Sequence, residues 1–136
     1  MWRANRPKTP EEVARYKELF AKDLVMPSQM EIMLMRADGS QMKQITSNGA
    51  ANFAPYFHPN GRQIIFASDM NNQSKGIPDF DLYLINRDGT GLERVTYDGG
   101  FDAFPMFTND GKKLVWVSSR AGDINIFTAD WLEKSR

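Results

Sequence analysis

The residues that could carry chemistry are few and scattered in this chain of 136 residues. His58 is the only histidine and there is no cysteine, so neither a zinc-ligand set nor a Ser-His-Asp triad is supported. His58 stands beside Pro59 in a turn pattern, which favours a structural role. Ser68-Asp69 and Ser118-Ser119-Arg120 close predicted strands without the G-x-S-x-G pattern of a nucleophilic serine. The sequence therefore predicts no catalytic residue.

Four aspartates are the only other grouping that suggests a site. Asp79 and Asp81 flank Phe80, and Asp98 and Asp102 flank two glycines. Their spacing does not match the twelve-residue calcium loop of an EF-hand. We interpret them as solvated loop residues, with calcium binding as the open alternative, and predict no metal and no cofactor.

Composition excludes several classes of partner. Basic and acidic residues number 17 each, so no net charge attracts nucleic acid or an anionic membrane. The apolar runs are far shorter than the roughly 20 residues that cross a bilayer, which argues against membrane insertion. The N-terminus MWRANRPKTPEE lacks the apolar core of a secretory signal. We expect a cytosolic chain, or one whose signal lies outside these residues.

One stretch of the sequence occurs twice, and this repeat defines the elements that would position any site. Residues 30–68 and 80–118 match at a fixed offset of 50. A period of this size with turn glycines in register is typical of repeat architectures. The matched pairs are Asp38-Gly39 with Asp88-Gly89, Thr46 with Thr96, Pro55 with Pro105, Phe57 with Phe107, Gly61 with Gly111, Phe66 with Trp116, and Ser68 with Ser118.

A helix and a series of short strands follow from local patterns. Thr9, Pro10 and Glu12 form a capping-box start, and the spacing of the apolar residues predicts a helix over 10–23. Period-two alternation and hairpin turns predict the strands, with loops at 97–102 and 119–123 and a third copy that begins at 125. The predicted strands span 31–37, 42–46, 55–58, 63–68, 80–86, 92–96, 103–108, 113–118 and 125–130.

Four short strands per repeat of about 45 residues indicate a β-propeller blade. The repeat resembles the WD-like repeat of the TolB family in two stretches: Asp102, Pro105, Phe107, Asp110-Gly111-Lys112, Leu114, Trp116 and Ser118, then Asn125-Ile126-Phe127. The other copy carries Pro55, Phe57, Pro59, Gly61, Ile64, Phe66, Ser68, Asp81-Leu82-Tyr83, Asp88-Gly89 and Val95-Thr96.

The resemblance implies a mainly β fold: a partial propeller of four-stranded antiparallel blades with one N-terminal helix. It divides the chain into segment 1–29, repeats 30–131 and tail 132–136. Blade one contributes its two outer strands (30–46), blade two is complete (55–96), and blade three lacks its last strand (103–130). Two departures from the family pattern matter. His58 and Asn60 replace the Ser and Asp of the family turn, and the stretch 50–52 lacks the counterpart of Asp102.

An incomplete ring leaves apolar blade faces and strand edges uncovered. Three remedies are open: the helix covers one face, chains associate as a homo-oligomer with strands 30–46 of one completing another, or the chain is the C-terminal part of a longer protein. The inter-blade core is expected to contain Phe53, Tyr56, Phe57, Phe101, Phe104, Phe107 and Trp116.

We predict a non-catalytic protein-interaction module completed by self-association. A propeller that gates substrate for a hydrolase or peptidase, and a small-ligand or sugar-binding propeller, are the alternatives. The TolB resemblance implies an envelope setting and a partner such as a peptidoglycan-associated lipoprotein. The candidate interaction residues are Tyr16, Leu19 and Phe20 on the helix, and Tyr97 and Phe101 in a blade-end loop.

Overall fold

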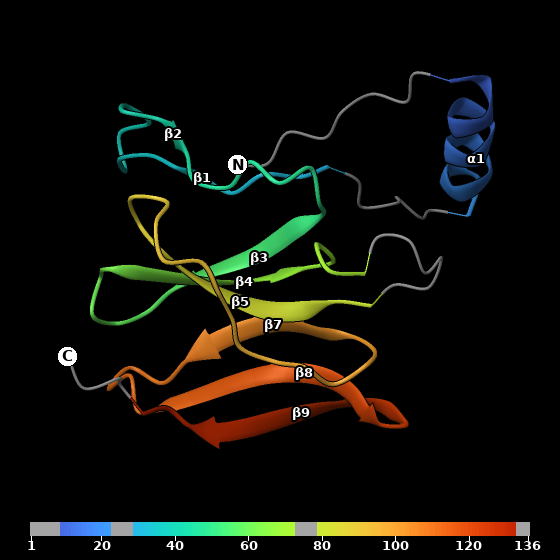
Figure 1. Cartoon of the computed structure of the whole chain (residues 1–136). Helices are drawn as coiled ribbons and strands as arrows, with labels where there is room; N and C mark the ends of the chain where they lie inside the picture. The colour runs from blue at the N-terminus through green and yellow to red at the C-terminus, as the bar shows by residue number, and fades with distance from the viewer. Residues whose placement is uncertain (1–8, 23–28, 73–78, 133–136) are drawn as a thin grey trace.

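The computed structural model describes residues 9–22, 29–72 and 79–132. One helix precedes three antiparallel sheets that are stacked one on the next (Figure 1). The sheets have the strand orders β1-β2, β3-β4-β5-β6 and β7-β8-β9. The bounds are α1 Pro10–Phe20, β1 Met33–Leu34, β2 Lys43–Gln44, β3 Asn52–Phe57, β4 Gln63–Ser68, β5 Asp81–Asn86, β6 Glu93–Arg94, β7 Asp102–Phe107, β8 Lys113–Ala121 and β9 Asp123–Asp130.

Each sheet is a meander in which every strand pairs with the next one along the chain. We call the sheets blade one, blade two and blade three in chain order. The prediction of a mainly β chain with antiparallel blades and an N-terminal helix is confirmed. The division of the chain at residues 29 and 131 stays a prediction. No helix of the described residues is long and apolar enough to span a bilayer.

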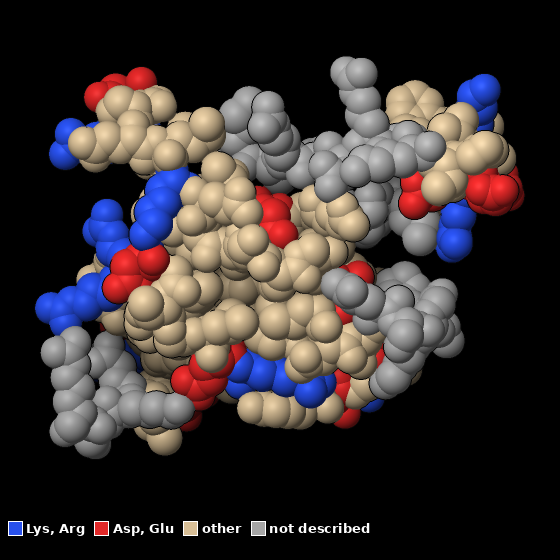
Figure 2. Space-filling model, turned by 45° about the horizontal axis from the view of Figure 1, so that its top comes forward, with Lys and Arg blue, Asp and Glu red and all other residues tan. Residues whose placement is uncertain are grey.

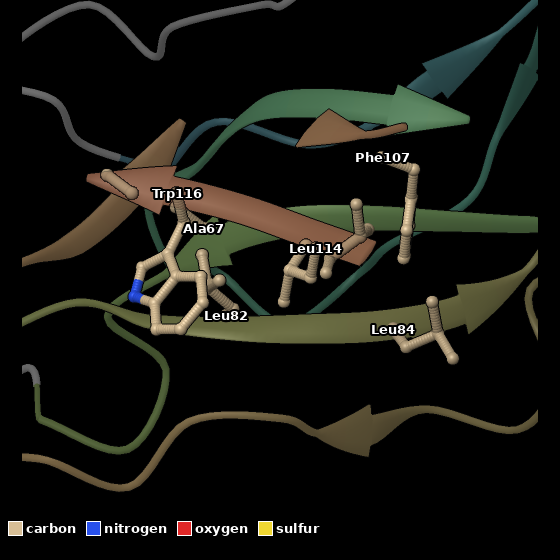
Figure 3. Packing of buried hydrophobic residues seen from close by; sticks show 8 residues of the cluster. Ala67, Leu82, Leu84, Phe107, Leu114 and Trp116 are labelled. Atoms are coloured by element: carbon tan, nitrogen blue, oxygen red, sulfur yellow. The ribbon is translucent and has the colours of Figure 1, made fainter. Parts of the chain in front are cut away.

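Blade two is buried on both faces because a blade packs on each side of it. Successive side chains of a strand point to opposite faces. In β4, Ile65 and Ala67 therefore pack toward blade three, and Ile64 and Phe66 toward blade one. The core between blades two and three consists of Ile65, Ala67, Leu82, Leu84, Ala103, Phe107, Leu114 and Trp116, most of them labelled in Figure 3.

The innermost strands begin earlier than predicted because each contains a bulge. Strand β3 starts at Asn52 rather than at 55, and β7 starts at Asp102 rather than at 103. Ala54 and Phe104 have φ values of 50° and 52°, and the register of each strand shifts at this point. Each is followed by a proline, which has no amide hydrogen to donate to the ladder. Pairing is therefore interrupted at the bulge and resumes at the residue after the proline.

Other predicted boundaries also need correction. Residues 119–123 are not a loop: β8 and β9 run on into a hairpin at Gly122, whose φ is 94°. The outer strands are shorter than predicted, because pairing of β1 with β2 and of β5 with β6 covers two residues each. Beyond each short ladder the chain is held by threonine side chains, described below.

Helix α1 begins as predicted and ends earlier. Thr9 Oγ1 accepts the Glu12 amide at 3.2 Å, and a Glu12 carboxylate oxygen accepts the Thr9 amide at 3.2 Å. The predicted helix ran to 23, but it ends at Phe20, where Lys22 donates to Leu19 in a tightened last turn. Position 23 lies outside the described residues. The helix makes no close contact with any strand (Figure 1), so it does not cover a blade face.

Candidate interaction site

The three candidate residues on α1 lie together on one side of the helix. The rings of Tyr16 and Phe20 are stacked with centroids 6.0 Å apart. Phe20 is 63% exposed, and no residue of α1 is buried. Acidic and basic side chains are also exposed on the helix (Figure 2). An apolar stripe that contacts no strand among the described residues agrees with a docking role, and binding by Tyr16, Leu19 and Phe20 stays a prediction.

The structure separates the two candidates in the β6–β7 connection. Tyr97 is 70% exposed, the Arg94 guanidinium lies 4.7 Å from its ring centroid, and its hydroxyl donates to the Arg94 carbonyl at 3.0 Å. Phe101 is half-buried in an aromatic cluster with Phe53, Phe80 and Phe104. Tyr97 is therefore a surface residue and Phe101 an inter-blade packing residue.

Tyr97 borders a groove between the outer parts of blades two and three. Two adjoining hollows, of about 580 and 300 Å³, share Val95, Tyr97 and Trp131 in their walls. Trp116 and Arg120 line the smaller hollow, beside β9. The groove exists because β6 pairs over two residues only and no strand of the described ranges lies beyond β9.

Two of the four aspartates that could suggest calcium are bound to arginines. The Asp81 carboxylate is fully buried and accepts from Arg94 at 2.6 Å. Burial raises the pKa of Asp81, and the Arg94 charge opposes that rise. Asp102 is equally buried and accepts from Arg120 at 2.8 Å and from the Trp116 indole at 3.2 Å.

The other two aspartates also have protein partners. Asp79 accepts the Gly100 amide at 3.1 Å, and Asp98 lies 3.8 Å from the Arg120 guanidinium. In the part of the chain that the structure describes, no group of three or more His, Cys, Asp or Glu side chains is arranged to hold a metal ion. Asp81 and Asp102 thus join strands within blades two and three, while Asp79 and Asp98 make polar contacts from the connecting segments outside the strands.

His58 lies between blades two and three. Its ring is buried and packs edge-on against Phe107, with centroids 4.4 Å apart. Its Nδ1 accepts the Asn60 amide at 3.1 Å, while its Nε2 has no hydrogen-bond partner. Asn60 accepts the Arg62 amide at 2.9 Å, as Asp110 accepts that of Lys112 at 3.0 Å, so the turn keeps its hydrogen bond without the family Asp.

The serines at the ends of the second strands have structural contacts. Ser68 and Ser118 are buried, and each hydroxyl accepts the amide two residues on, from Met70 and Arg120, at 3.2 Å. Tyr83 is buried too, and burial raises the pKa of its hydroxyl to about 12. That hydroxyl lies near Asn71 but makes no hydrogen bond of ordinary geometry.

One face of blade three is left uncovered by the residues that the structure describes. Strand registers show that its residues occupy the positions which, in blade two, are covered by blade three. In blade two Leu82 is 0% exposed, whereas its counterpart Ile126 is 74% exposed. We call this surface the open face; it consists of Met106, Val115, Val117, Ile126 and Thr128, the counterparts of Tyr56, Ile65, Ala67, Leu82 and Leu84.

Two aromatic residues predicted for the inter-blade core are instead largely exposed. Phe57 is 46% exposed because blade one has no inner strands to cover it. Phe104 is 53% exposed because the bulge turns its side chain toward Phe53 and Phe101 at the rim of the stack. The sequence indicated that open ends would exist but did not identify their residues. The strand registers, read against the repeat, identify them.

Comparison with solved structures defines the class of the fold: the stacked four-stranded meander is a TolB-like β-propeller blade, and the chain is part of such a propeller. A structure described as TolB from Agrobacterium tumefaciens matches with a TM-score of 0.65 and 25% identity over 75% of this chain. TolB from Acinetobacter baumannii matches with a TM-score of 0.61 and 23% identity over 77% of this chain.

The match covers only part of those proteins. The chain spans 38% of the length of the first and 25% of the second. An oligogalacturonate lyase in complex with manganese overlaps with a TM-score of 0.39 and 16% identity, too low to carry an argument. No family model matches the sequence, and no curated protein matches it either.

Proposed function

We propose that the chain is a non-catalytic protein-interaction module whose TolB-like blades are completed by self-association. The single observation that carries this proposal is the open face of blade three. The same repeat positions are covered in blade two, where blade three packs on them, whereas Ile126 at 74% and Met106 at 52% are exposed in blade three, the last of the described blades. A contiguous apolar surface of this kind marks an interaction site.

The chain also offers a surface that could meet the open face. In the described part of the chain, blade one has two outer strands, and Phe57 and Met35 are each 46% exposed at that end of the stack. A contact between the two different ends of successive copies is heterologous, and it closes into a ring or grows as a filament depending on the rotation between copies.

Light scattering across a concentration series tests the proposal. We expect a molar mass that is a multiple of 15.5 kDa and that rises with concentration. A single species of 15.5 kDa at every concentration would show that the module does not complete itself. Thermal melts should shift upward with concentration in the same range, because association stabilises the folded state by mass action.

A further inference from the structure

Among the residues that the structure describes, strand β9 pairs on one side only. It pairs with β8 along its whole length, and in the strand order β7-β8-β9 it is the last strand. Natural edge strands use charged residues and prolines to prevent unwanted pairing. Between Asp123 and Asp130, β9 has neither. Nothing in the sequence of β9 therefore disfavours the addition of a further strand.

The chain itself shows how a fourth strand attaches. In blade two, Leu82 accepts the Val95 amide at 2.8 Å and donates its own amide to Thr96 Oγ1 at 2.9 Å. Blade one repeats both bonds at 2.8 Å. The recurring element is a β-branched apolar residue followed by threonine, and in blade one the participants are Ile32, Ile45 and Thr46.

Ile126 presents the same two groups at the edge of blade three. Ala67 is opposite Leu82 and Val117 is opposite Ile126 in matching registers. The amide and carbonyl of one strand residue point to the same side of the strand. Those of Leu82 point to β6 and away from β4, so those of Ile126 point away from β8, toward the open edge. The edge of β9 thus has the donor and acceptor that both existing outer strands use.

We propose that β9 binds an extended segment of another polypeptide as its fourth strand, with a β-branched residue and a following threonine paired to Ile126. Strand addition of this type gains affinity from main-chain bonds and specificity from alternate side chains. The alternate side chains on the blade-two side enter the hollow of about 300 Å³ beside β9.

One position of the bound segment has a predicted preference. In blade two, Arg94 pairs with Asp81. In blade three, Asn125 occupies the position that corresponds to Asp81. The Arg120 guanidinium already lies nearby, 5.1 Å from the Trp116 ring centroid. A neutral side chain before the β-branched residue suits this site better than an arginine. Blade one has that choice in Gln44, so residues 40–48, SQMKQITSN, supply the probe peptide.

Binding is measured by NMR on the whole chain with this synthetic peptide. The outward-facing amides of Ile126 and Thr128 should shift and exchange more slowly, and those of Asn125 and Phe127, which face β8, should change less. Peptides with Thr46→Val, or with an N-methyl group at Ile45, each lose one hydrogen bond and should bind about threefold to tenfold more weakly. Equal binding of all three peptides, or no binding of the parent peptide, overturns the proposal.

The matched protein variants are Ile126→Pro and Ile126→Val. Proline removes only an amide that faces away from β8, which an edge strand tolerates, and it should abolish binding, whereas valine keeps the amide and should retain binding. Retained binding by Ile126→Pro contradicts the proposal; if its spectrum shows that it is unfolded, the peptide variants alone decide.

The inference rests on the interaction role proposed above, but not on self-association. The titration is therefore repeated on Met106→Asp, which alters the open face and leaves the β9 edge intact. Peptide binding by a monomeric chain would refute self-association and support strand addition. An oligomer that binds no peptide would support self-association and refute strand addition.

Discussion

Phe57 and Phe107 hold the same position in successive repeats, yet Phe107 is 4% exposed and Phe57 is 46% exposed. The difference comes from the preceding blade. Phe107 faces blade two, where the His58 ring packs on it at 4.4 Å, whereas Phe57 faces the place where blade one has no inner strands. One residue type in one local structure thus has two environments, which makes the pair a direct probe of blade stacking.

Replacement of this pair should have unequal effects on stability. Phe107→Ala removes a buried ring and should lower the free energy of unfolding by about 3–5 kcal/mol. Phe57→Ala should cost about half as much in the monomer, because much of the ring is exposed when no second copy covers it. Urea unfolding of both variants in the monomeric Met106→Asp background measures the difference, and equal costs there would contradict the exposure of Phe57.

Gly61 and Gly111 offer a second matched pair, with φ values of 68° and 70°. Alanine at either position costs about 1–2 kcal/mol for the left-handed backbone. A Cβ at Gly111 would also lie 3.2 Å from the His58 ring, whereas one at Gly61 meets nothing within 4 Å. We expect Gly111→Ala to cost about 1 kcal/mol more than Gly61→Ala. Similar melting temperatures would contradict the packing of His58 against blade three.

The ion pair of Arg94 with Asp81 should be necessary for stability at neutral pH. Arg94→Gln leaves the buried Asp81 carboxylate without its cation. The free energy of unfolding should fall by about 2–3 kcal/mol, less than for a fully buried ion pair, because Arg94 is partly exposed. Lys113→Gln is the control, because Lys113 and Asp130 form an exposed pair and should contribute little.

The pH dependence of this variant follows from the raised pKa of Asp81. Burial already raises it above its usual 3.8, and loss of Arg94 raises it further. A carboxyl whose folded pKa is raised binds more protons in the folded state, so its contribution to stability falls as pH rises through that pKa. The deficit of Arg94→Gln should therefore be largest near neutral pH and shrink on acidification toward 3.8. Urea unfolding measures the stability difference between the wild type and Arg94→Gln at each pH. A difference that grows on acidification would contradict a raised pKa of Asp81 in the folded state.

Thr96 should stabilise the outer strand through its hydroxyl. Thr96 is 8% exposed and its Oγ1 accepts the Leu82 amide at 2.9 Å. Thr96→Val keeps the shape and leaves that amide without its acceptor, at a cost of about 1–3 kcal/mol. In the monomeric Met106→Asp background, Thr128→Val on the exposed open face is the control and should change stability by less than about 0.5 kcal/mol. Equal effects of Thr96→Val and Thr128→Val would show that the threonine hydrogen bond does not stabilise the outer strand.

The sequence predicted the features that depend on local pattern. The repeat offset located the strands, Asp88 at the β5–β6 turn accepts the Thr90 amide as a turn aspartate should, and Thr9 caps the helix. These succeed because neighbouring residues determine turns, caps and strand periodicity.

The features that depend on tertiary context were not predictable. The bulge at Ala54 adds residues to a strand through a backbone angle that alanine rarely adopts. The exposure of Phe57 depends on inner strands that blade one does not have among the described residues. The open face has the same kind of residues as a covered face, so only the strand registers distinguish Ile126 from Leu82. Tyr97 and Phe101 were predicted together as interaction residues of a blade-end loop, and only the packing of the sheets distinguishes the exposed Tyr97 from the half-buried Phe101.

The most direct test of the central claim compares the molar mass of the wild-type chain with that of two variants, by light scattering at matched concentrations. Met106→Asp places a charge on the open face, at a side chain 52% exposed within the chain, and Lys112→Asp places one on an exposed turn. We predict that the wild type and Lys112→Asp associate and that Met106→Asp is a 15.5 kDa monomer. A monomeric wild type, or a Met106→Asp variant that associates as strongly, would contradict completion of the blades by self-association.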